Sequence, residues 1–284
     1  MVPVWWSIPM SDLLQQWLPT MIAMLATGAC AGILAGLLGV GGGIVIVPVL
    51  YFVLQGLGVS PATAMLVATG TSLLVIVPTS ISSMRAHHKR GNVDWALIKR
   101  WWPWMVIGVI AGSSVALRAK GLLLSTVFGV IAILVALNML LRAKSPPLAR
   151  QLPGAVGQGS MAGGIGFFSV MMGVGGGTIG VPLLTACNYP SHRAVGTASF
   201  FGLLISIPGA LAMLFASTPA DAPEGMIGAV NLPGFALIVP LTVLLAPVGA
   251  WLGAKLDAVM LKRVFAVFLC ISGGRMLMQV VQSL

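Results

Sequence analysis

The longest uncharged stretch of this chain runs from residue 13 to residue 84, and these 72 residues contain no Asp, Glu, Lys or Arg. Only 7% of the 284 residues are charged, whereas an ordinary soluble domain has about 25%. A helix that crosses a bilayer needs about 20 mostly apolar residues, so the chain has room for about eight to ten crossings and no soluble domain. The sequence therefore predicts an all-α integral membrane protein. It excludes a cytosolic enzyme, a secreted disulfide scaffold and a disordered tail protein.

The distribution of charge and cysteine limits the partners of the chain. The net charge is +10, but the basic residues lie in loops between apolar runs, as the positive-inside bias of membrane proteins predicts. We therefore expect a lipid bilayer around the protein and no nucleic acid. The expected location is the cell membrane, which in a bacterium is the inner membrane. Cys30, Cys187 and Cys270 lie inside apolar runs without metal-ligand spacing, so we expect no metal, no cofactor and no disulfide framework.

The N-terminal residues differ from a cleavable signal peptide. Residues 1–17 contain no Lys or Arg, whereas a signal peptide begins with a positively charged region. They carry Trp5, Trp6 and Trp17, and tryptophan is enriched where the membrane meets water. We therefore expect residues 1–17 to form an interfacial segment.

The chain contains an internal repeat. Residues 39–50, GVGGGIVIVPVL, return as residues 173–184, GVGGGTIGVPLL, at an offset of 134, which also relates Gly32 to Gly166. The segments ATGTS at 68–72 and VGTAS at 195–199 correspond in either of two registers one residue apart. Later pairs follow an offset of 137: Gly91 with Gly228, Val93 with Val230, Pro103 with Pro240, Gly112 with Gly249, Phe128 with Phe265, and Asn138 with Arg275. We expect repeat 1 at 18–142, a cytoplasmic linker at 143–153 and repeat 2 at 154–284.

Each repeat is predicted to contain five apolar helices. The segment 44–57 would be about 21 Å long as a helix, too short for a hydrocarbon core of about 30 Å. It is better explained as the returning arm of a helical hairpin broken by glycines, so each repeat is a hairpin followed by three transmembrane helices. The expected helices are 19–38, 44–57, 61–84, 101–117 and 122–141 in the first half, and 154–172, 178–188, 194–215, 232–253 and 264–281 in the second.

Loop charges predict the relative orientation of the repeats. The loop 85–100 carries five Lys or Arg residues, whereas its counterpart, 217–231, carries only Asp221 and Glu224. If both hairpins return to their starting side, twelve Lys and Arg residues lie inside and only Arg118 and Lys120 lie outside. The repeats then have inverted topology. The alternative, parallel repeats with four crossings each, would place either 85–100 or 142–150 outside and fits the charges less well.

The duplicated glycines interrupt the helices at a position typical of an anion site. Three successive glycines disfavour helix, and freed backbone groups are tolerated in a membrane only where protein or a polar cavity satisfies them. The helices that begin after the breaks direct unpaired N–H groups and the positive end of the helix dipole toward them. The alternative is close helix packing through small residues. The candidate binding residues at the breaks are Gly41, Gly42, Gly43, Ile44, Gly175, Gly176, Gly177 and Thr178.

Other polar residues are candidates for the same anion. Hydroxyl groups lie downstream of each break and can donate to the oxygens of an oxyanion: Thr69, Thr71, Ser72, Thr197 and Ser199. The alternative for each is a hydrogen bond between helices or to the preceding turn. Arg275 is the only basic residue inside a predicted helix, and an embedded charge is a functional candidate. Its alternative is an extended side chain that reaches the membrane surface.

Three features resemble the sulfite exporter family TauE/SafE, also called toluene sulfonate uptake permeases. They are the duplicated GVGGGxxxVPxL segment, the downstream GTS or GTAS segment, and the basic loop before Gly91-Asn92-Val93-Asp94. The resemblance covers nearly the whole chain. It implies a multi-helix exporter of sulfur-containing oxyanions such as sulfite, thiosulfate, sulfoacetate or other organosulfonates. No residue identifies which of these anions is carried.

The positions of the acidic residues limit how transport can be coupled to an ion, because none is predicted at membrane depth. Asp12, Asp94, Asp221, Glu224 and Asp257 all fall in expected loops or helix flanks, so no carboxylate is in place to relay protons or bind Na⁺. This pattern disfavours an intramembrane hydrolase and favours movement of the anion down its own gradient. Paired breaks favour alternating access, and a homo-oligomer is compatible with the sequence. The alternatives are an anion channel and a non-transporting membrane subunit of a larger complex.

Overall fold

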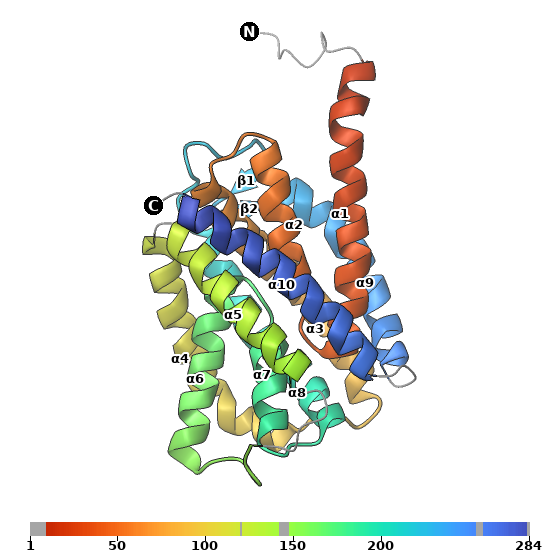
Figure 1. Ribbon diagram of the computed structural model, residues 1–284, viewed down its shortest axis with the longest axis vertical. Coiled ribbons are helices and arrows are strands. Elements are labelled where there is room, and N and C mark those ends of the chain that lie inside the picture. The colour runs from red at the N-terminus through yellow and green to blue at the C-terminus, as the bar shows by residue number, and fades with distance from the viewer. Residues whose placement is uncertain (1–9, 120, 142–147, 254–257, 283–284) are drawn as a thin grey trace.

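The computed structural model describes residues 10–119, 121–141, 148–253 and 258–282. Within these ranges the chain forms ten α-helices and one two-stranded hairpin (Figure 1). The helices are α1 (Met10–Leu38), α2 (Gly43–Gly56), α3 (Pro61–His88), α4 (Trp95–Arg118), α5 (Gly121–Leu141), α6 (Ala155–Met172), α7 (Gly177–Ala186), α8 (Ser191–Leu214), α9 (Leu232–Leu252) and α10 (Ala258–Gln282), and the strands are β1 (Met226–Ile227) and β2 (Val230–Asn231).

The prediction of an all-α membrane protein is confirmed. Five helices of the described part of the chain are long and apolar enough to cross a membrane: Leu18–Leu38, Pro61–His88, Gly121–Leu141, Ser191–Leu214 and Leu232–Leu252. Each predicted helix has a counterpart. Three helices begin six or more residues earlier than expected: α1 at Met10, α4 at Trp95 and α10 at Ala258. Helix α4 starts early because the Asp94 side chain caps it by accepting from the amide of Leu97 at 3.1 Å.

That residues 1–17 form an interfacial segment stays a prediction. Helix α1 already begins at Met10 and continues through Pro19, so residues 10–17 are helical. Trp5 and Trp6 lie outside the described residues, as do residues 143–147 of the expected linker.

Two helical hairpins enter the bundle from opposite ends. Helix α1 descends from the N-terminal end of the molecule, and α2 returns toward that end (Figure 1). Helices α6 and α7 form the second hairpin, which starts and finishes at the other end. There the amides of Leu148 and Ala149 donate to the carbonyl of Ala186 at 2.8 and 3.0 Å. The last residue of α7 therefore lies beside the segment that leads into α6.

Helices α3 and α8 run antiparallel between these hairpins. The amide of Ser60, just before α3, donates at 3.1 Å to Asp221, which follows α8. At the opposite end the Tyr189 hydroxyl, just before α8, donates at 2.5 Å to Asp94, which follows α3. Each helix thus begins where its partner finishes.

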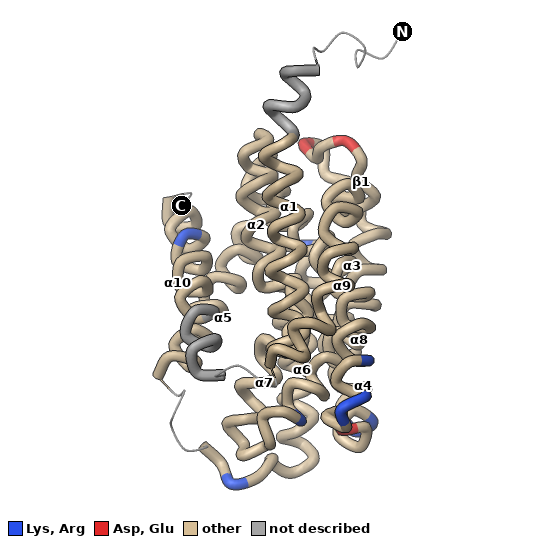
Figure 2. The backbone as a smooth tube through the Cα atoms, turned by 90° about the vertical axis from the view of Figure 1, so that its right-hand side faces the viewer, with Lys and Arg blue, Asp and Glu red and all other residues tan. Residues whose placement is uncertain are grey.

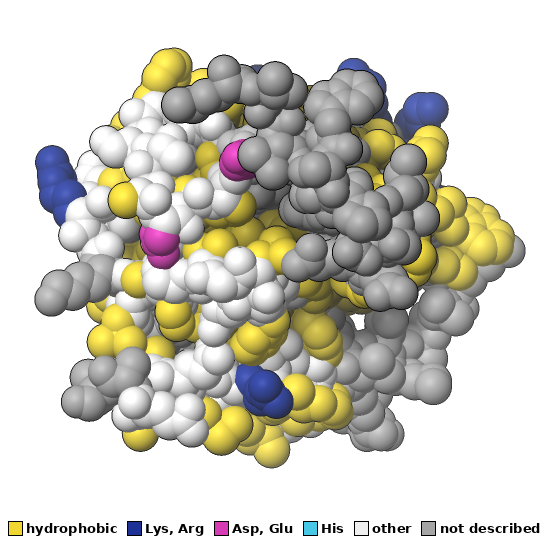
Figure 3. Space-filling view, turned by 90° about the horizontal axis from the view of Figure 1, so that it is seen from above, with side chains coloured by type: hydrophobic (Ala, Val, Ile, Leu, Met, Phe, Trp, Pro, Cys, Tyr) yellow, Lys and Arg dark blue, Asp and Glu magenta, His cyan; other side chains and the backbone are white. Residues whose placement is uncertain are grey.

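Basic residues concentrate at one end of the bundle. Figure 2 shows the acidic loop beside β1 at one end and most of the described Lys and Arg residues at the other. Seen from above, the acidic side chains stand among uncharged groups, with Lys and Arg at the periphery (Figure 3). The helices between the two ends present mainly apolar side chains, as a bilayer requires.

Hydrogen bonds of the first half recur in the second half. The Thr71 hydroxyl oxygen accepts from the amide of Asn231 at 2.9 Å, and the Thr197 hydroxyl oxygen accepts from the amide of Asp94 at 3.0 Å. Asn231 also caps α9 through the amide of Gly234 at 2.7 Å, as Asp94 caps α4. These matched bonds pair Thr71 with Thr197 at an offset of 126. The structure thereby resolves the register that the sequence leaves open.

Glycines bring the outer helices into main-chain contact. A Cβ atom added at Gly112 would lie 2.5 Å from the carbonyl oxygen of Phe167, and one added at Gly249 would lie 2.0 Å from that of Ile33. These contacts join α4 to α6 and α1 to α9, and they match at the repeat offsets. Small residues allow this close approach in membrane bundles. The packing interpretation therefore holds for these two glycines, and also for Gly32 and Gly36 of α1, where an added Cβ would lie 2.8 and 1.8 Å from main-chain atoms of α9.

Candidate functional site

The two glycine breaks meet each other inside the bundle. A Cβ atom added at Gly43 would lie 2.5 Å from the carbonyl oxygen of Gly173, and one at Gly177 would lie 2.0 Å from that of Gly39. The repeat offset of 134 converts the first contact into the second. Gly175 faces Gly41, whose Cα would lie 3.3 Å from an added Cβ. The two hairpins thus touch through their main chains.

The breaks reach this contact with different backbone conformations. In the first break Gly39, Gly41 and Gly42 have φ values of 66°, 71° and 79°, a left-handed conformation that favours glycine. In the second break only Gly173 has a positive φ, at 68°. Gly176 has φ −60° and is restricted instead by space, because an added Cβ would lie 2.5 Å from the Cβ of Phe201. The two halves therefore share a sequence motif without sharing one backbone conformation.

These contacts account for the glycines without a ligand. Main-chain groups of one break occupy the space beside Gly43, Gly175 and Gly177, and residues of α1 and α8 occupy the space beside Gly42 and Gly176. Close packing therefore accounts for these glycines. The glycines alone consequently do not locate a binding site. The argument for a ligand depends on polar groups that this packing leaves unsatisfied.

Two helices begin at the breaks without side-chain caps. Helix α2 starts at Gly43 after Gly42, and α7 starts at Gly177 after Gly176, and neither preceding glycine has a side chain that can accept a hydrogen bond. The first amides of a helix have no intrahelical acceptor and carry the positive end of the helix dipole. Ile44 and Thr178, in these first turns, are 0% and 2% exposed. The Thr178 amide donates to the carbonyl of Gly175 at 3.3 Å, and the first turns of both helices are buried, without side-chain caps, where the hairpins touch.

The predicted hydroxyl groups fall into two sets. Ser72 donates to the carbonyl of Gly173 at 2.7 Å and Ser199 donates to that of Gly196 at 2.6 Å, while Thr71 and Thr197 hold the cap residues of α9 and α4. For these four residues the helix-contact alternative describes the geometry. The hydroxyls of Thr69 and Thr178 are buried and have no hydrogen-bond partner. A buried donor without a partner is costly, which makes these two residues the strongest ligand candidates at the breaks.

Thr69 lies at the breaks because its main chain packs against Gly173, a contact that the sequence around Thr69 does not predict. A Cβ added at Gly173 would lie 2.7 Å from the Cα of Thr69, and one added at Gly39 would lie 2.4 Å from the carbonyl oxygen of Val195. Thr69 and Val195 occupy equivalent positions in the two halves at the offset of 126. Only one half therefore presents a hydroxyl there, and the site is chemically asymmetric.

The structure does not bring Arg275 to the glycine breaks. Its side chain is exposed on α10, and its guanidinium lies 5.7 Å from the ring centroid of Phe52 on α2. One turn later Gln279 donates to Gln55 at 3.2 Å. These contacts join α10 to the middle and end of α2. Arg275 is therefore placed in a helix contact at the periphery.

One carboxylate at each end of the bundle joins the two halves. Asp94 accepts from Tyr189 and forms an ion pair with Arg193 at 3.3 Å. At the other end, Asp221 accepts from the amide of Ser60 and from the hydroxyl of Thr63 at 2.5 Å. The sequence indicated neither cluster, because each joins residues that are far apart in the chain.

The electrostatics of these clusters favour ionised carboxylates. Burial opposes ionisation of Asp94, but hydrogen bonds from Tyr189 and the Leu97 amide, together with the charge of Arg193, outweigh it and hold the pKa of Asp94 below its ordinary value. Burial and the neighbouring carboxylate raise the pKa of Tyr189 to about 12. Hydrogen bonds from Ser60 and Thr63 lower the pKa of Asp221. Both clusters therefore persist at neutral pH.

Comparison with known proteins places this architecture among membrane transporters. The chain is 33% identical over 250 residues to a protein of Haemophilus influenzae named "Probable membrane transporter protein", covering 87% of this chain and 94% of the relative. It is 29% identical over 256 residues to the Bacillus subtilis "Probable membrane transporter protein YunE", covering 84% and 87%. A third relative with such a name, from Methanocaldococcus jannaschii, is 31% identical over 231 residues, covering 78% and 81%. No solved structure matches the chain.

The spanning helices and these relatives identify a multi-pass membrane protein. Residues 24–276 match the sequence family described as "Sulfite exporter TauE/SafE". The chain, with its two glycine-broken hairpins, therefore belongs to the sulfite exporter TauE/SafE family.

Proposed function

We propose that this protein exports sulfur-containing oxyanions, such as sulfite or an organosulfonate, by alternating access. The family supports a membrane transporter, and the observation that carries the proposal is the unpartnered hydroxyl of Thr178 in the first turn of α7, beside the contact between the breaks. An anion at this point would accept from that hydroxyl and from uncapped amides of α2 and α7. Such a site needs no basic side chain.

The proposed cycle treats the halves as inverted repeats. Three observations support this: the hairpins enter from opposite ends (Figure 1), α3 and α8 are antiparallel, and contacts of one half recur in the other. Related halves that exchange conformations give alternating access around a central site. In this cycle the Asp221 cluster opens on one side of the membrane and the Asp94 cluster opens on the other.

Single cysteines test the proposed topology. In a background lacking Cys30, Cys187 and Cys270, we expect His88→Cys and Ala220→Cys to react with an impermeant maleimide from opposite sides of the membrane. Both positions are exposed and lie in the loops that the charge pattern assigns to opposite sides. Leu148→Cys should react from the same side as His88→Cys, because its segment contacts the end of the second hairpin. Labelling of His88→Cys and Ala220→Cys from one side would contradict inverted repeats.

Substrate flux through purified protein tests the binding site. In proteoliposomes offered sulfite, thiosulfate, sulfoacetate, sulfate or chloride, we expect saturable transport of at least one sulfur oxyanion. Thr178→Val should raise the KM for that anion about tenfold, because a hydrogen bond to a charged group contributes about 1.5–3 kcal/mol. The shape of the side chain is retained, so packing changes little.

Thr185→Val is the matched control in the same helix. The Thr185 hydroxyl already donates to the carbonyl of Val181 at 2.9 Å, so its loss should change the KM by less than twofold. Equal effects of the two substitutions would place the anion elsewhere. Flux that rises linearly with concentration would favour an anion channel over alternating access.

A further inference from the structure

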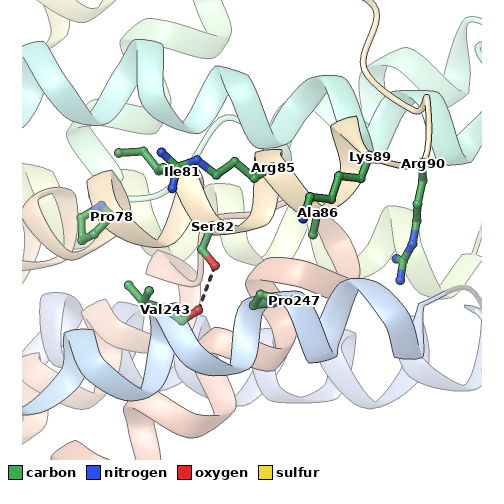
Figure 4. Close-up of a pocket in the computed structure, with 9 residues that line it drawn as sticks. All are labelled: Pro78, Ile81, Ser82, Arg85, Ala86, Lys89, Arg90, Val243 and Pro247. Atoms are coloured by element: carbon green, nitrogen blue, oxygen red, sulfur yellow. Dashed lines mark hydrogen bonds between the residues drawn. The ribbon is translucent and has the colours of Figure 1, made fainter.

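A groove between α3 and α9 lies outside the proposed transport site. Its volume is about 640 Å³. Pro78 and Ile81 of α3 and Val243 and Pro247 of α9 form its apolar walls. The Ser82 hydroxyl donates to the carbonyl of Val243 at 2.8 Å and joins the walls (Figure 4). Next to this wall, Leu244 and Val248 of α9 are 68% and 42% exposed, which is typical of a surface that faces lipid chains.

Three basic residues, from the C-terminal turn of α3 and the residues just after it, line this groove. The side chains of Arg85 and Lys89 extend along α3, whereas that of Arg90 reaches toward α9 (Figure 4). There the Arg90 guanidinium donates to the carbonyl of Ala250. The groove therefore combines apolar walls with basic side chains along α3, as an amphiphile with a negatively charged head requires.

The positive charges are not neutralised by carboxylates in the part of the chain that the structure describes. Within those residues the ion pair is that of Arg193 with Asp94, and neither residue lines this groove. The side chains of Arg85 and Lys89 are exposed. Unpaired cations at the edge of a membrane attract anionic headgroups.

The repeat shows that the fold does not need these charges. At the offset of 126, Arg85 corresponds to Leu211 and Lys89 corresponds to Phe215. Leu211 and Phe215 are 49% and 87% exposed, so the equivalent surface of α8 is apolar. The architecture is thus compatible with uncharged residues at both positions, and the basic side chains are particular to one copy.

We propose that this groove binds one anionic phospholipid. Its phosphate lies between Arg85 and Lys89, and one acyl chain lies along the walls formed by Ile81 and Val243. A phospholipid fits better than free phosphate, because an inorganic ion would leave the apolar walls of the groove without an apolar group to contact. The site is separate from the glycine breaks and does not depend on the proposed substrate.

Native mass spectrometry of the detergent-purified protein tests this site. With equal amounts of phosphatidylglycerol and phosphatidylcholine added, we expect at least tenfold preferential retention of phosphatidylglycerol. Arg85→Gln combined with Lys89→Gln should lower this preference about tenfold. Ala86→Phe, which fills the groove and keeps its charges, should lower phosphatidylglycerol retention to a similar degree. All variants must first match the parent in gel-filtration profile and melting temperature.

The control is Lys99→Gln combined with Arg150→Gln, which removes the same charge from exposed residues that do not line the groove. It should retain the lipid preference within twofold. An equal loss in the control would overturn the proposal in favour of general attraction to positive charge. Full retention by Ala86→Phe would do so as well, because the acyl chain would then not need the groove. Displacement of the lipid by 10 mM inorganic phosphate would indicate a free-anion site instead.

Discussion

Replacing Gly177 with Ala is expected to destabilise the protein severely and to abolish transport. The added Cβ would lie 2.0 Å from the carbonyl oxygen of Gly39 and 2.9 Å from the Cα of Val40, and backbone atoms cannot move aside as a flexible side chain can. Overpacking typically costs about 1–3 kcal/mol and occasionally more. We expect a fall in melting temperature on the order of 10 °C, measured by thermal unfolding in detergent.

Gly164→Ala is the control for this prediction. Gly164 lies inside α6 with no atom within 4 Å of an added Cβ, and Ala favours helix over Gly by about 1 kcal/mol. The variant should therefore be as stable as the parent or slightly more so. Equal stability of Gly177→Ala and Gly164→Ala would show that the two breaks do not touch in the working protein.

Uptake of a permanently charged sulfonate is expected to follow the membrane potential alone. Asp94, Asp221 and Glu224 lie in loops, Asp12 lies in the first turn of α1, and Asp257 lies outside the described residues. No carboxylate is therefore placed to carry a proton through the described part of the bundle. One charge moving through 100 mV changes the free energy by about 2.3 kcal/mol. An inside-positive potential of that size should raise the accumulation of methanesulfonate in proteoliposomes about fiftyfold, without a pH or Na⁺ gradient.

Methanesulfonate is chosen because it carries no titratable proton. With sulfite, a proton travelling on the substrate would resemble coupling. Protein-free liposomes and the Thr178→Val variant provide the controls for leak and for the proposed site. A strict requirement for a proton or Na⁺ gradient would reveal an ion site that the carboxylates do not indicate, built most simply from hairpin carbonyls.

The spanning helices could be predicted because apolar runs and their boundaries are local properties of the sequence. The start of α4 was missed by six residues, because the capping role of Asp94 depends on its fold: its amide is held by Thr197, more than one hundred residues away. The short second arms of the hairpins were found because length alone distinguishes them from spanning helices. Local information was therefore sufficient for element type and insufficient for helix starts that depend on distant contacts.

The candidate site was less predictable because residues of one type have different partners. Thr71, Thr178 and Thr197 look alike in the sequence, yet only Thr178 of these three is left without a hydrogen-bond partner. Arg275 was a candidate because of its charge, but its place on α10 takes it to Phe52. Gly42 illustrates a further limit. Its φ of 79° and its proximity to the carbonyl of Ala31 mean that a Leu there would disturb the fold whatever the ligand.

The contact between the breaks also restricts how the two halves of this gene can diverge. When two side chains clash, a smaller partner restores the fit, so paired substitutions can accumulate over time. At Gly43 and Gly177 the opposing atom is a main-chain carbonyl, which every amino acid possesses and no substitution removes. A change at either glycine thus has no compensating change on the other side. Substitutions at both copies of the motif are therefore disfavoured. This explains why the two halves still share the motif, whereas their flanking helices share few residues.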